Sequence, residues 1–376
     1  MMLFSCPSIP PRGLYSAARA RQRGVALITV LMVFAIASLI AGKVIMSKAV
    51  DTQRVTGMVN RTQAYYYALA AESLAMLALR QDDQNDVDDQ EMADDLEEMW
   101  ASGAIPFEID SIGSVVVQII DLNRFYNINN MVQGNGQVND QELERFRHLL
   151  VELQLDSELA DNLKDWLDSD DREAGYLSES SAYLEQTPAY RAANSPMLDI
   201  SELRLVNGFE PEVLQVLLPH ITAVATVGVV PLNVNTATDY ALTTLQESVV
   251  GGQSKGLTIS AAQNIVSERP YDDDQDFNAR SGTRNLLTST AVNSATGQVG
   301  GATGTNQNYS RYTKRLGVTS LYYEINIRAN YAGHMAYLTT VVWQEGIGAN
   351  AKYVVLSRRE TDNSARLAQF SLNSNQ

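Results

Sequence analysis

The sequence predicts an α+β fold in which a long N-terminal helix packs on an antiparallel sheet that carries a large all-helical insertion. Three observations lead to this prediction. A helix-compatible stretch without proline runs from Val25 to Arg80. Helical periodicity dominates residues 124–293, and three alternating strand patterns occupy residues 311–376. A helix that faces a sheet on one side, with a helical block between its strands, accounts for this order.

The N-terminal helix starts with a run of 18 apolar residues from Val25 to Gly42, preceded by Arg12, Arg19, Arg21 and Arg23. At 1.5 Å per residue this run is just long enough to cross a bilayer core of roughly 30 Å. The arginines predict a cytoplasmic N-terminus and an external body. A cleaved signal peptide fits less well, because no small-residue cleavage site follows and helix-forming sequence continues to Arg80. A simple type II membrane anchor is the plainer alternative.

The charge is strongly negative and unevenly distributed. The net charge is −16, and residues 1–24 carry four arginines and no acid, so the remaining 352 residues stand near −20. Such a body repels nucleic-acid phosphates and anionic lipids and suits divalent cations. The single cysteine, Cys6, lies in the leading segment, so the body contains no thiol nucleophile and no disulfide.

The segment after the helix is the most acidic part of the chain, with ten acids and no base in residues 82–98. We expect a solvated surface loop and a short helix here. A strand is predicted at 114–123, where β-branched residues are concentrated. Two amphipathic helices follow, one with Asn139 or Asp140 as its cap. Their apolar stripes are Leu143, Phe146, Leu149, Leu150 and Leu153 in the first helix, and Leu159, Leu163, Trp166 and Leu167 in the second.

Two later stretches are typical of helix-hairpin-helix units. In "ISELRLVNGFEPEVLQVLLPHI" Gly208 separates two short helices, and "LNVNTATDYALTTL" with "ISAAQNIVSERP" forms the second unit. A glycine-rich loop at 294–310 then leads to "YTKRLGVTSLYYEINIRANY", "HMAYLTTVVWQ" and "AKYVVLSRRE". These alternating runs predict an antiparallel meander.

Gly24, directly before the apolar helix at Val25, resembles the processing site of type IV pilins and type II secretion pseudopilins. The resemblance implies that a prepilin peptidase cuts after Gly24 and methylates Val25, so that the spanning helix is retained. Most members carry a glutamate at the fifth mature position, where this chain has Thr29. In the family that carboxylate is thought to meet the amine of a neighbouring subunit, so its absence is expected of a subunit with no neighbour above it. An equally acceptable interpretation is that Thr29 is simply a residue that the helix tolerates.

The motifs "FYNINN", "DWLDSDDREAGY", "AYRAANSPMLDISELRLVNGF" and "LNVNTA" resemble, in this order, the minor pseudopilins of the type II secretion protein K family. The resemblance implies a pilin-like fold with a helix-hairpin-helix, or SAM-like, insertion. It divides the chain into a leader (1–24), a transmembrane and pilin helix (25–80), the first part of the pilin-like domain (81–123), the insertion (124–293), the glycine-rich loop (294–310) and C-terminal strands (311–376).

The same resemblance implies a structural role at the tip of a Gram-negative pseudopilus, which the protein would help to initiate. It implies a single-pass protein of the inner membrane with its body in the periplasm. The expected partners are the minor pseudopilins I and J, other pseudopilins and the prepilin peptidase, with no nucleic acid. We expect no enzymatic activity, because the three histidines are far apart and the sequence contains no G-x-S-x-G, P-loop, H-E-x-x-H or C-x-x-C motif.

A candidate calcium site lies in "DWLDSDDREAGYLSES", residues 165–180. Crowded carboxylates repel one another unless a cation offsets their charge, and Ca²⁺ accepts six to eight oxygen ligands. The candidate ligands are Asp168, Asp170, Glu173 and Glu179. Members of the resembled family bind calcium in their helical domain, which favours this interpretation over a solvated acidic loop. "PYDDDQDF", residues 270–277, is a weaker candidate of the same kind.

The helix-hairpin-helix units also support a rival hypothesis. Sequence similar to "LNVNTA" occurs in competence proteins, where such a module binds DNA outside the cytoplasmic membrane. These modules present glycine-rich backbone amides and basic side chains to phosphate. Here Glu210 and Glu212 follow the hairpin, so we expect the units to pack against protein instead.

Overall fold

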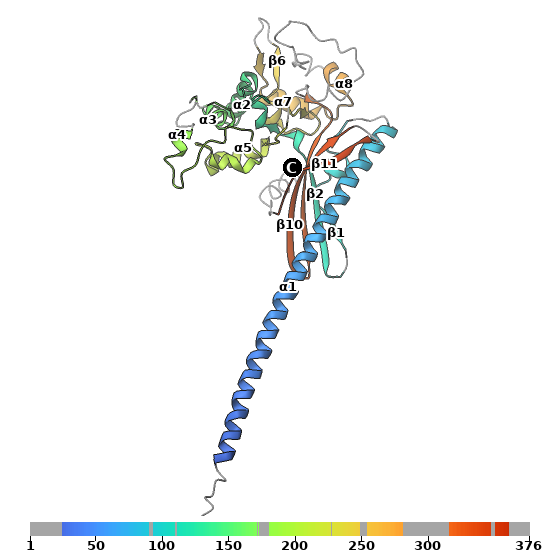
Figure 1. Ribbon diagram of the computed structural model, residues 1–376. Helices are drawn as coiled ribbons and strands as arrows, with labels where there is room; N and C mark the ends of the chain where they lie inside the picture. Colours follow the sequence, from blue (N-terminus) through green and yellow to red (C-terminus); the bar gives the residue numbers. More distant parts are fainter. Residues whose placement is uncertain are drawn as a thin grey trace, which may run out of the picture. The chain divides into compact units, whose positions relative to one another are not determined.

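The computed structural model describes residues 25–89, 93–109, 111–170, 172, 180–226, 228–248, 254–280, 316–346 and 350–360 (Figure 1). The chain divides into two compact units, residues 1–59 and residues 60–376. Helix α1 (Val25–Asp89) supplies the described part of the first unit and the beginning of the second.

In the first unit, α1 exposes its apolar side chains from Leu27 to Met46. The sequence favours a helix here because it contains no proline and only one glycine, Gly42, between Val25 and Met46. By length and composition, α1 is the one described helix able to cross a membrane. The Thr29 hydroxyl donates to the carbonyl of Ala26 at 2.9 Å, so this polar group is satisfied within the helix.

The second unit is built on a five-stranded antiparallel sheet of order β1-β2-β9-β10-β11. The strands are β1 (Ile105–Glu108), β2 (Gly113–Asp121), β9 (Tyr322–Tyr331), β10 (His334–Glu345) and β11 (Lys352–Arg359). Ala68, Ala71, Ala75 and Leu79 recur at helical spacing on α1 and pack on the sheet residues Val115 to Ile119 and Tyr323 to Ala329. The short η1 (Met99–Ala101) closes this core with Trp100.

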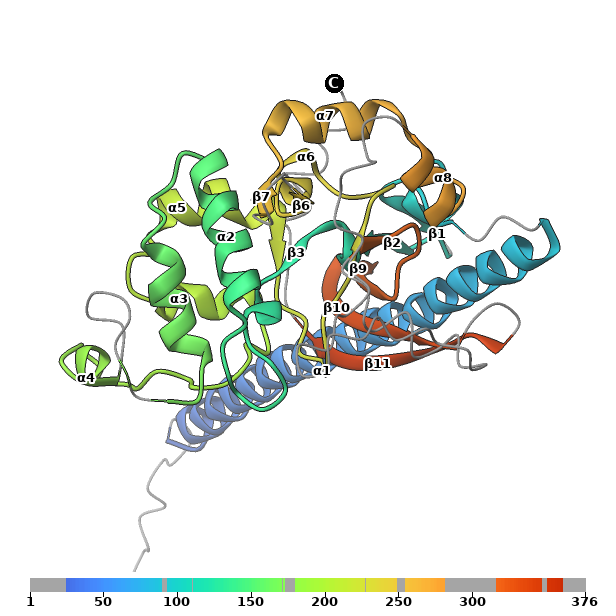
Figure 2. The same ribbon diagram turned by 90° about the horizontal axis from the view of Figure 1, so that it is seen from above.

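The chain between β2 and β9 forms the helical part of the second unit (Figures 1 and 2). Its first core gathers apolar side chains of α2, α3, η4 and α5. The elements of this part are η2 (Leu122–Arg124), β3 (Tyr126–Asn127), η3 (Ile128–Met131), α2 (Asp140–Glu152), α3 (Leu159–Leu167), α4 (Ser180–Tyr183), η4 (Ile200–Leu205), α5 (Pro211–Leu217), η5 (Leu218–His220) and β4 (Ile221–Thr222).

A second, smaller core lies around α6 and α7, which Figure 2 shows apart from α2, α3 and α5. Its elements are β5 (Leu232–Asn233), α6 (Asp239–Leu242), β6 (Gln246–Ser248), β7 (Ser254–Gly256), α7 (Ile259–Ser267), α8 (Asp274–Ala279) and β8 (Leu316–Gly317). The two cores meet where His148 Nε2 of α2 donates to the carbonyl of Leu257 at 2.7 Å and Glu152 accepts from the Ile259 N–H at the start of α7.

These elements confirm the helices predicted from their apolar stripes, the strand at 114–123 and the C-terminal meander. The expectation of a loop was wrong for residues 82–89. Instead of a solvated loop, α1 continues to Asp89, and Asp83 accepts hydrogen bonds from Gln344 and from Tyr353 at the sheet. The tertiary contacts hold this acidic segment in the helix.

Candidate functional site

Four buried asparagines clamp the helical part together. Each uses both atoms of its amide on one residue of a distant segment, accepting from the backbone N–H and donating to the carbonyl. The pairs are Asn127 with Val224, Asn129 with Met197, Asn130 with Val230, and Asn235 with Tyr271. The motifs "FYNINN" and "LNVNTA" therefore supply side chains that hydrogen-bond to the backbone of segments distant in the sequence.

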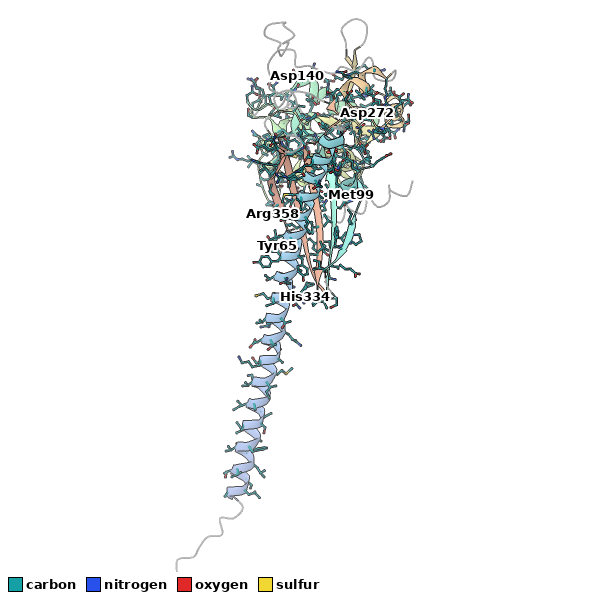
Figure 3. All side chains as sticks on the ribbon, turned by 90° about the vertical axis from the view of Figure 1, so that its right-hand side faces the viewer. Tyr65, Met99, Asp140, Asp272, His334 and Arg358 are labelled. Atoms are coloured by element: carbon teal, nitrogen blue, oxygen red, sulfur yellow. The ribbon has the colours of Figure 1, made fainter. Side chains whose placement is uncertain are left out.

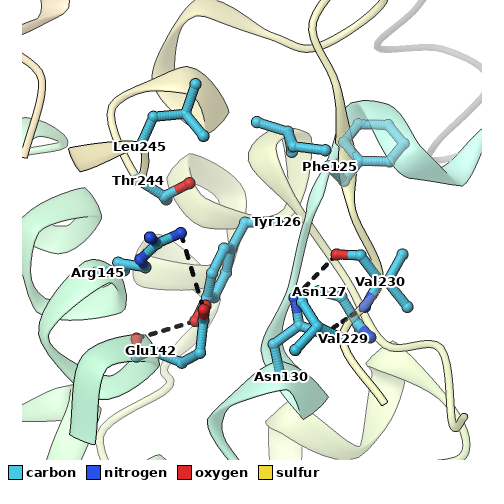
Figure 4. Close-up of a pocket in the computed structure, with 11 residues that line it drawn as sticks. Phe125, Tyr126, Asn127, Asn130, Glu142, Arg145, Val229, Val230, Thr244 and Leu245 are labelled. Carbon is cyan, nitrogen blue, oxygen red and sulfur yellow. Dashed lines mark hydrogen bonds and ion pairs between the residues drawn. The ribbon is translucent and has the colours of Figure 1, made fainter. Parts of the chain in front are cut away.

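Two of these asparagines, Asn127 and Asn130, line a small cavity of about 10 Å³, drawn in Figure 4. Figure 4 shows Asn130 joined to Val230, and Arg145 facing Glu142 from the same helix α2. The Arg145 and Glu142 side chains are buried, with 3.8 Å between Nη1 and Oε1, and the Tyr126 hydroxyl donates to the carbonyl of Glu142. The cavity has room for about one water molecule, so it offers no space for a substrate.

The candidate calcium loop begins where α3 ends. Asp168 is the C-terminal cap of α3, and it is buried, as is Asp165 one turn earlier. Asp170 is exposed and accepts from the Arg172 N–H at 2.9 Å. Burial, followed by the nearby Asp170 carboxylate, raises the pKa of Asp168 to about 6. Glu173 and Glu179 lie outside the described residues, so the structure brings together two of the four predicted ligands.

Asn194 joins this loop, and sequence reasoning missed it. Its backbone N–H donates to the carbonyl of Trp166 at 2.9 Å, and its amide donates to the carbonyl of Asp170 at 3.2 Å. Asn194 has φ +46°, a left-handed conformation that asparagine tolerates better than most residues. Nothing in the spacing of residues 170 and 194 predicts that they meet, and the left-handed conformation of Asn194 is visible only in the structure.

The acids of the weaker candidate at 270–277 make local contacts within the fold. Asp273 caps α8 by accepting from the N–H groups of Gln275 and Asp276 at 2.7 Å each. Asp276 forms an ion pair with Arg280, one turn later. These acids therefore stabilise a helix start and an i,i+4 pair.

The first hairpin is packed against protein. Gly208 has φ +86°, and a Cβ there would come within 2.7 Å of Leu159 on α3. Phe209 is buried, and the carbonyl of Asn207 accepts from the Asn162 amide. The glycine is thus required both by its backbone conformation and by the close approach of α3.

Comparison with known proteins points to a single family. A family model described as type II secretion system protein K matches residues 124–226. The type II secretion system protein K of Pseudomonas aeruginosa is 36% identical over 296 residues, covering 76% of this chain and 83% of that protein. The chain belongs to the type II secretion system protein K family. The protein K of Pectobacterium carotovorum subsp. carotovorum is 30% identical over 263 residues, covering 67% of this chain and 76% of that protein.

A solved structure shares the fold. A chain in the crystal structure of the GspK-GspI-GspJ complex from enterotoxigenic Escherichia coli superimposes with a TM-score of 0.61 and 22% identity, over 82% of this chain and all of that one. This likeness confirms the predicted fold class. As a member of the protein K family, the chain is a structural minor pseudopilin of a protein-transport system and not an enzyme.

The processing residues fall at the edge of the described structure. Val25 is the first residue of α1, while Gly24 lies outside the described residues. Processing at Gly24 and methylation of Val25 stay predictions.

Proposed function

We propose that this protein K family member is the tip subunit of a type II secretion pseudopilus, where it helps to initiate assembly. The observation that carries the proposal is the helical part placed between the adjacent strands β2 and β9. A filament shaft repeats one subunit at close spacing, and a helical part of this size on every subunit would collide with its neighbours. Thr29 agrees with this position, because its hydroxyl is satisfied inside α1 and it offers no carboxylate to a subunit above.

Counting copies tests the tip position. Crosslinking of assembled pseudopili followed by quantitative mass spectrometry should find about one copy per filament, with neighbours on one side only. Deleting the chain should impair secretion, while overproduced shaft subunits still polymerise. An even distribution along the filament would refute the tip position and leave family membership untouched.

The proposed partners are minor pseudopilins I and J. The support is the related chain, which was crystallised in a GspK-GspI-GspJ complex. A pull-down of the soluble body, from residue 46 onward, with purified pseudopilins I and J tests this partnership.

We propose that α1 anchors the protein in the inner membrane with the body in the periplasm. The apolar exposed surface from Leu27 to Met46 suits lipid, and the four arginines ahead of it favour a cytoplasmic N-terminus. A prepilin peptidase would then cut between Gly24 and Val25. Replacing Gly24 by a bulky residue should leave a precursor longer by the leader, which mass spectrometry of the N-terminus detects.

We propose calcium as the ligand of the loop at the end of α3. The residues fit a hard cation: within the described part of the chain, Asp168 Oδ1 is buried and receives no hydrogen bond. Asp165 is also fully buried, and Asp170 and Asn194 bring further oxygens to the same loop. Asp168 and Asp170 would hold the ion, with Glu173 and Glu179 as further proposed ligands. Bound calcium would offset the repulsion between the carboxylates and join α3 to the segment around residue 194.

A further inference from the structure

An apolar groove runs along the second unit between α1 and the β1–β2 edge of the sheet, and it encloses about 370 Å³. The groove is lined on the helix side by Ala70, Leu74 and Ala78, which recur every fourth residue and therefore share one face of α1. Strand residues form the opposite side, with Phe107 on β1 and Val117 on β2. Small alanines on the helical wall permit close approach by a partner.

Several large apolar side chains around the groove remain exposed. Leu74 is 64% exposed, Met99 80% and Phe107 51%. Figure 3 places Met99 beside α1. Single exposed apolar residues are ordinary, but a contiguous set that lines a groove indicates an interaction surface.

The shape favours inserted side chains over an added strand. β1 is an edge strand of four residues, and Pro106 at its second position has no N–H to donate. A partner strand would therefore find a short and incomplete ladder. The groove has room for a few large side chains, which suits an amphipathic helix that lies over the groove and inserts one apolar row.

One end of the groove is acidic. Asp82 and Asn85 line it there. Carboxylate oxygens of Asp82, Asp86 and Asp94 lie within 4.8 Å of one another. Burial raises the pKa of Asp82 and of Asp94, and a lysine or arginine brought to this end would favour the ionised carboxylates and be attracted by them. The opposite end, near Phe107 and Ile109, is apolar.

We propose that this groove is the docking site of an amphipathic helix of a partner pseudopilin, whose apolar row enters between α1 and β1 and whose lysine or arginine lies against Asp82. The inference rests on the proposed assembly with other pseudopilins. It goes beyond that assembly by assigning the contact surface and the chemistry of the segment that it receives.

Binding measurements with full-length proteins in detergent test the groove. Pseudopilins I and J from the same organism serve as probes, separately and together. Leu74→Glu and Phe107→Glu should each weaken binding by about tenfold or more, because a charge would face the inserted apolar row. The matched controls are Leu77→Glu on the same helix, where Leu77 is 58% exposed and does not line the groove, and Leu356→Glu on the far edge strand β11. Both controls should leave binding unchanged.

The charged end is tested by a pair of variants at the exposed Asn85. Asn85→Lys should weaken binding, and Asn85→Asp should maintain or tighten it, with both differences reduced at high salt. A photo-crosslinking amino acid at Met99 should capture a helical segment of I or J that contains a lysine or arginine.

The outcomes separate the two proposals. If the wild-type chain binds neither I nor J, the proposed assembly fails. If it binds them and Leu74→Glu weakens binding no more than Leu77→Glu, the assembly stands and the groove assignment is overturned. Crosslinks from Met99 to a second copy of this chain, to lipid or to a small molecule would also overturn it. Matching melting curves of the variants show that lost binding does not come from unfolding.

Discussion

Asn130 shows how single side chains hold the helical part together. Its amide satisfies both the N–H and the carbonyl of the buried Val230, at 2.9 and 3.1 Å. Asn130→Ala would leave two backbone groups without these partners, each at a cost of about 1–3 kcal/mol. We expect the free energy of unfolding, measured by urea titration, to fall by about 2–5 kcal/mol. Asn135→Ala, at an exposed position with only local hydrogen bonds to Gln137, is the control and should change it by less than about 0.5 kcal/mol. Equal effects would show that the clamp contributes nothing.

Asp121 is a buried acid whose protonation is linked to folding. Burial raises its pKa to about 6, although Ser320, Thr236 and the Asn123 N–H donate to the carboxylate. The folded chain thus holds this proton more tightly than the unfolded chain does. The contribution to stability is fully present below the unfolded pKa near 4 and is lost as the pH rises through 6, a change of about 3 kcal/mol.

Comparing wild type with Asp121→Asn isolates this contribution. As the pH rises from 4 to 7, the free energy of unfolding of the wild type should fall relative to that of the variant, with most of the change between pH 4 and 6. Urea titrations at each pH measure the difference. Parallel curves would contradict the assignment, whatever the constant offset between the two proteins.

At the scale of elements, two neighbouring arginines of β11 serve different parts of the fold, because successive side chains of a strand point to opposite faces. Val341 pairs with Ser357 and Val342 with Val355, so Leu356 is an extra residue. Arg358 then reaches Glu72 on α1 with two hydrogen bonds, Nη2 to Oε2 at 2.7 Å and Nε to Oε1 at 3.0 Å. Figure 3 shows Arg358 beside α1. Its neighbour Arg359 forms an ion pair with Asp199 at the start of η4.

The ion pair between Arg358 and Glu72 predicts that the effects of mutating its two residues on the free energy of unfolding are not additive. Glu72 is buried and also accepts from Thr340, while the Arg358 side chain is 41% exposed, so Arg358→Ala should lower the free energy of unfolding by about 1–3 kcal/mol. Glu72→Gln in the same chain should restore part of that loss, and urea titration of the four proteins of the cycle gives the coupling. Arg328→Ala, at an exposed position of β9, is the control. Additive losses would argue against a specific pair.

Helices and strands could be predicted from the sequence where one pattern of apolar residues extended over the whole element. The stripes of α2 and α3 and the alternation of the last three strands are complete signals, because burial on one face dictates them. β1 was not predicted, since its four residues are mostly exposed and show no alternation. The end of α1 was misplaced because its acids are held by contacts from Gln344 and Tyr353, far along the chain. Likewise, the acids of the candidate calcium loop were visible in the sequence, but Asn194 joins them only through the fold.

At the scale of the whole molecule, calcium should stabilise one core more than the others. The loop at Asp168 belongs to the core of α2, α3 and α5, which is separate from the core between α1 and the sheet. At a hundredfold excess over Kd, binding to the folded state alone contributes about 2.7 kcal/mol. We expect calcium to raise the melting temperature of the soluble body and to slow hydrogen exchange in α3 and around residue 194, with little change in β9 and β10.

Variants make this prediction specific. Asp168→Ala with Asp170→Ala should abolish both effects, whereas Asp272→Asn, at an exposed acid outside the loop, should retain them. Identical melting curves with calcium and with chelator would contradict the proposal that the loop binds calcium.

The pairing of β2 with β9 imposes an order on folding. Asp121 and Tyr323 are register partners, yet about 200 residues lie between these strands. The ribosome therefore releases α1 and β2 long before the strand that completes the centre of the sheet. Contacts this distant in sequence form slowly, because the intervening chain must first be brought into a closed loop. The helical part, whose contacts are more local, can fold first and shorten that loop. During synthesis the sheet-facing alanines of α1 remain only partly covered until β9 is made, and this interval is when the chain is most open to aggregation or to a chaperone.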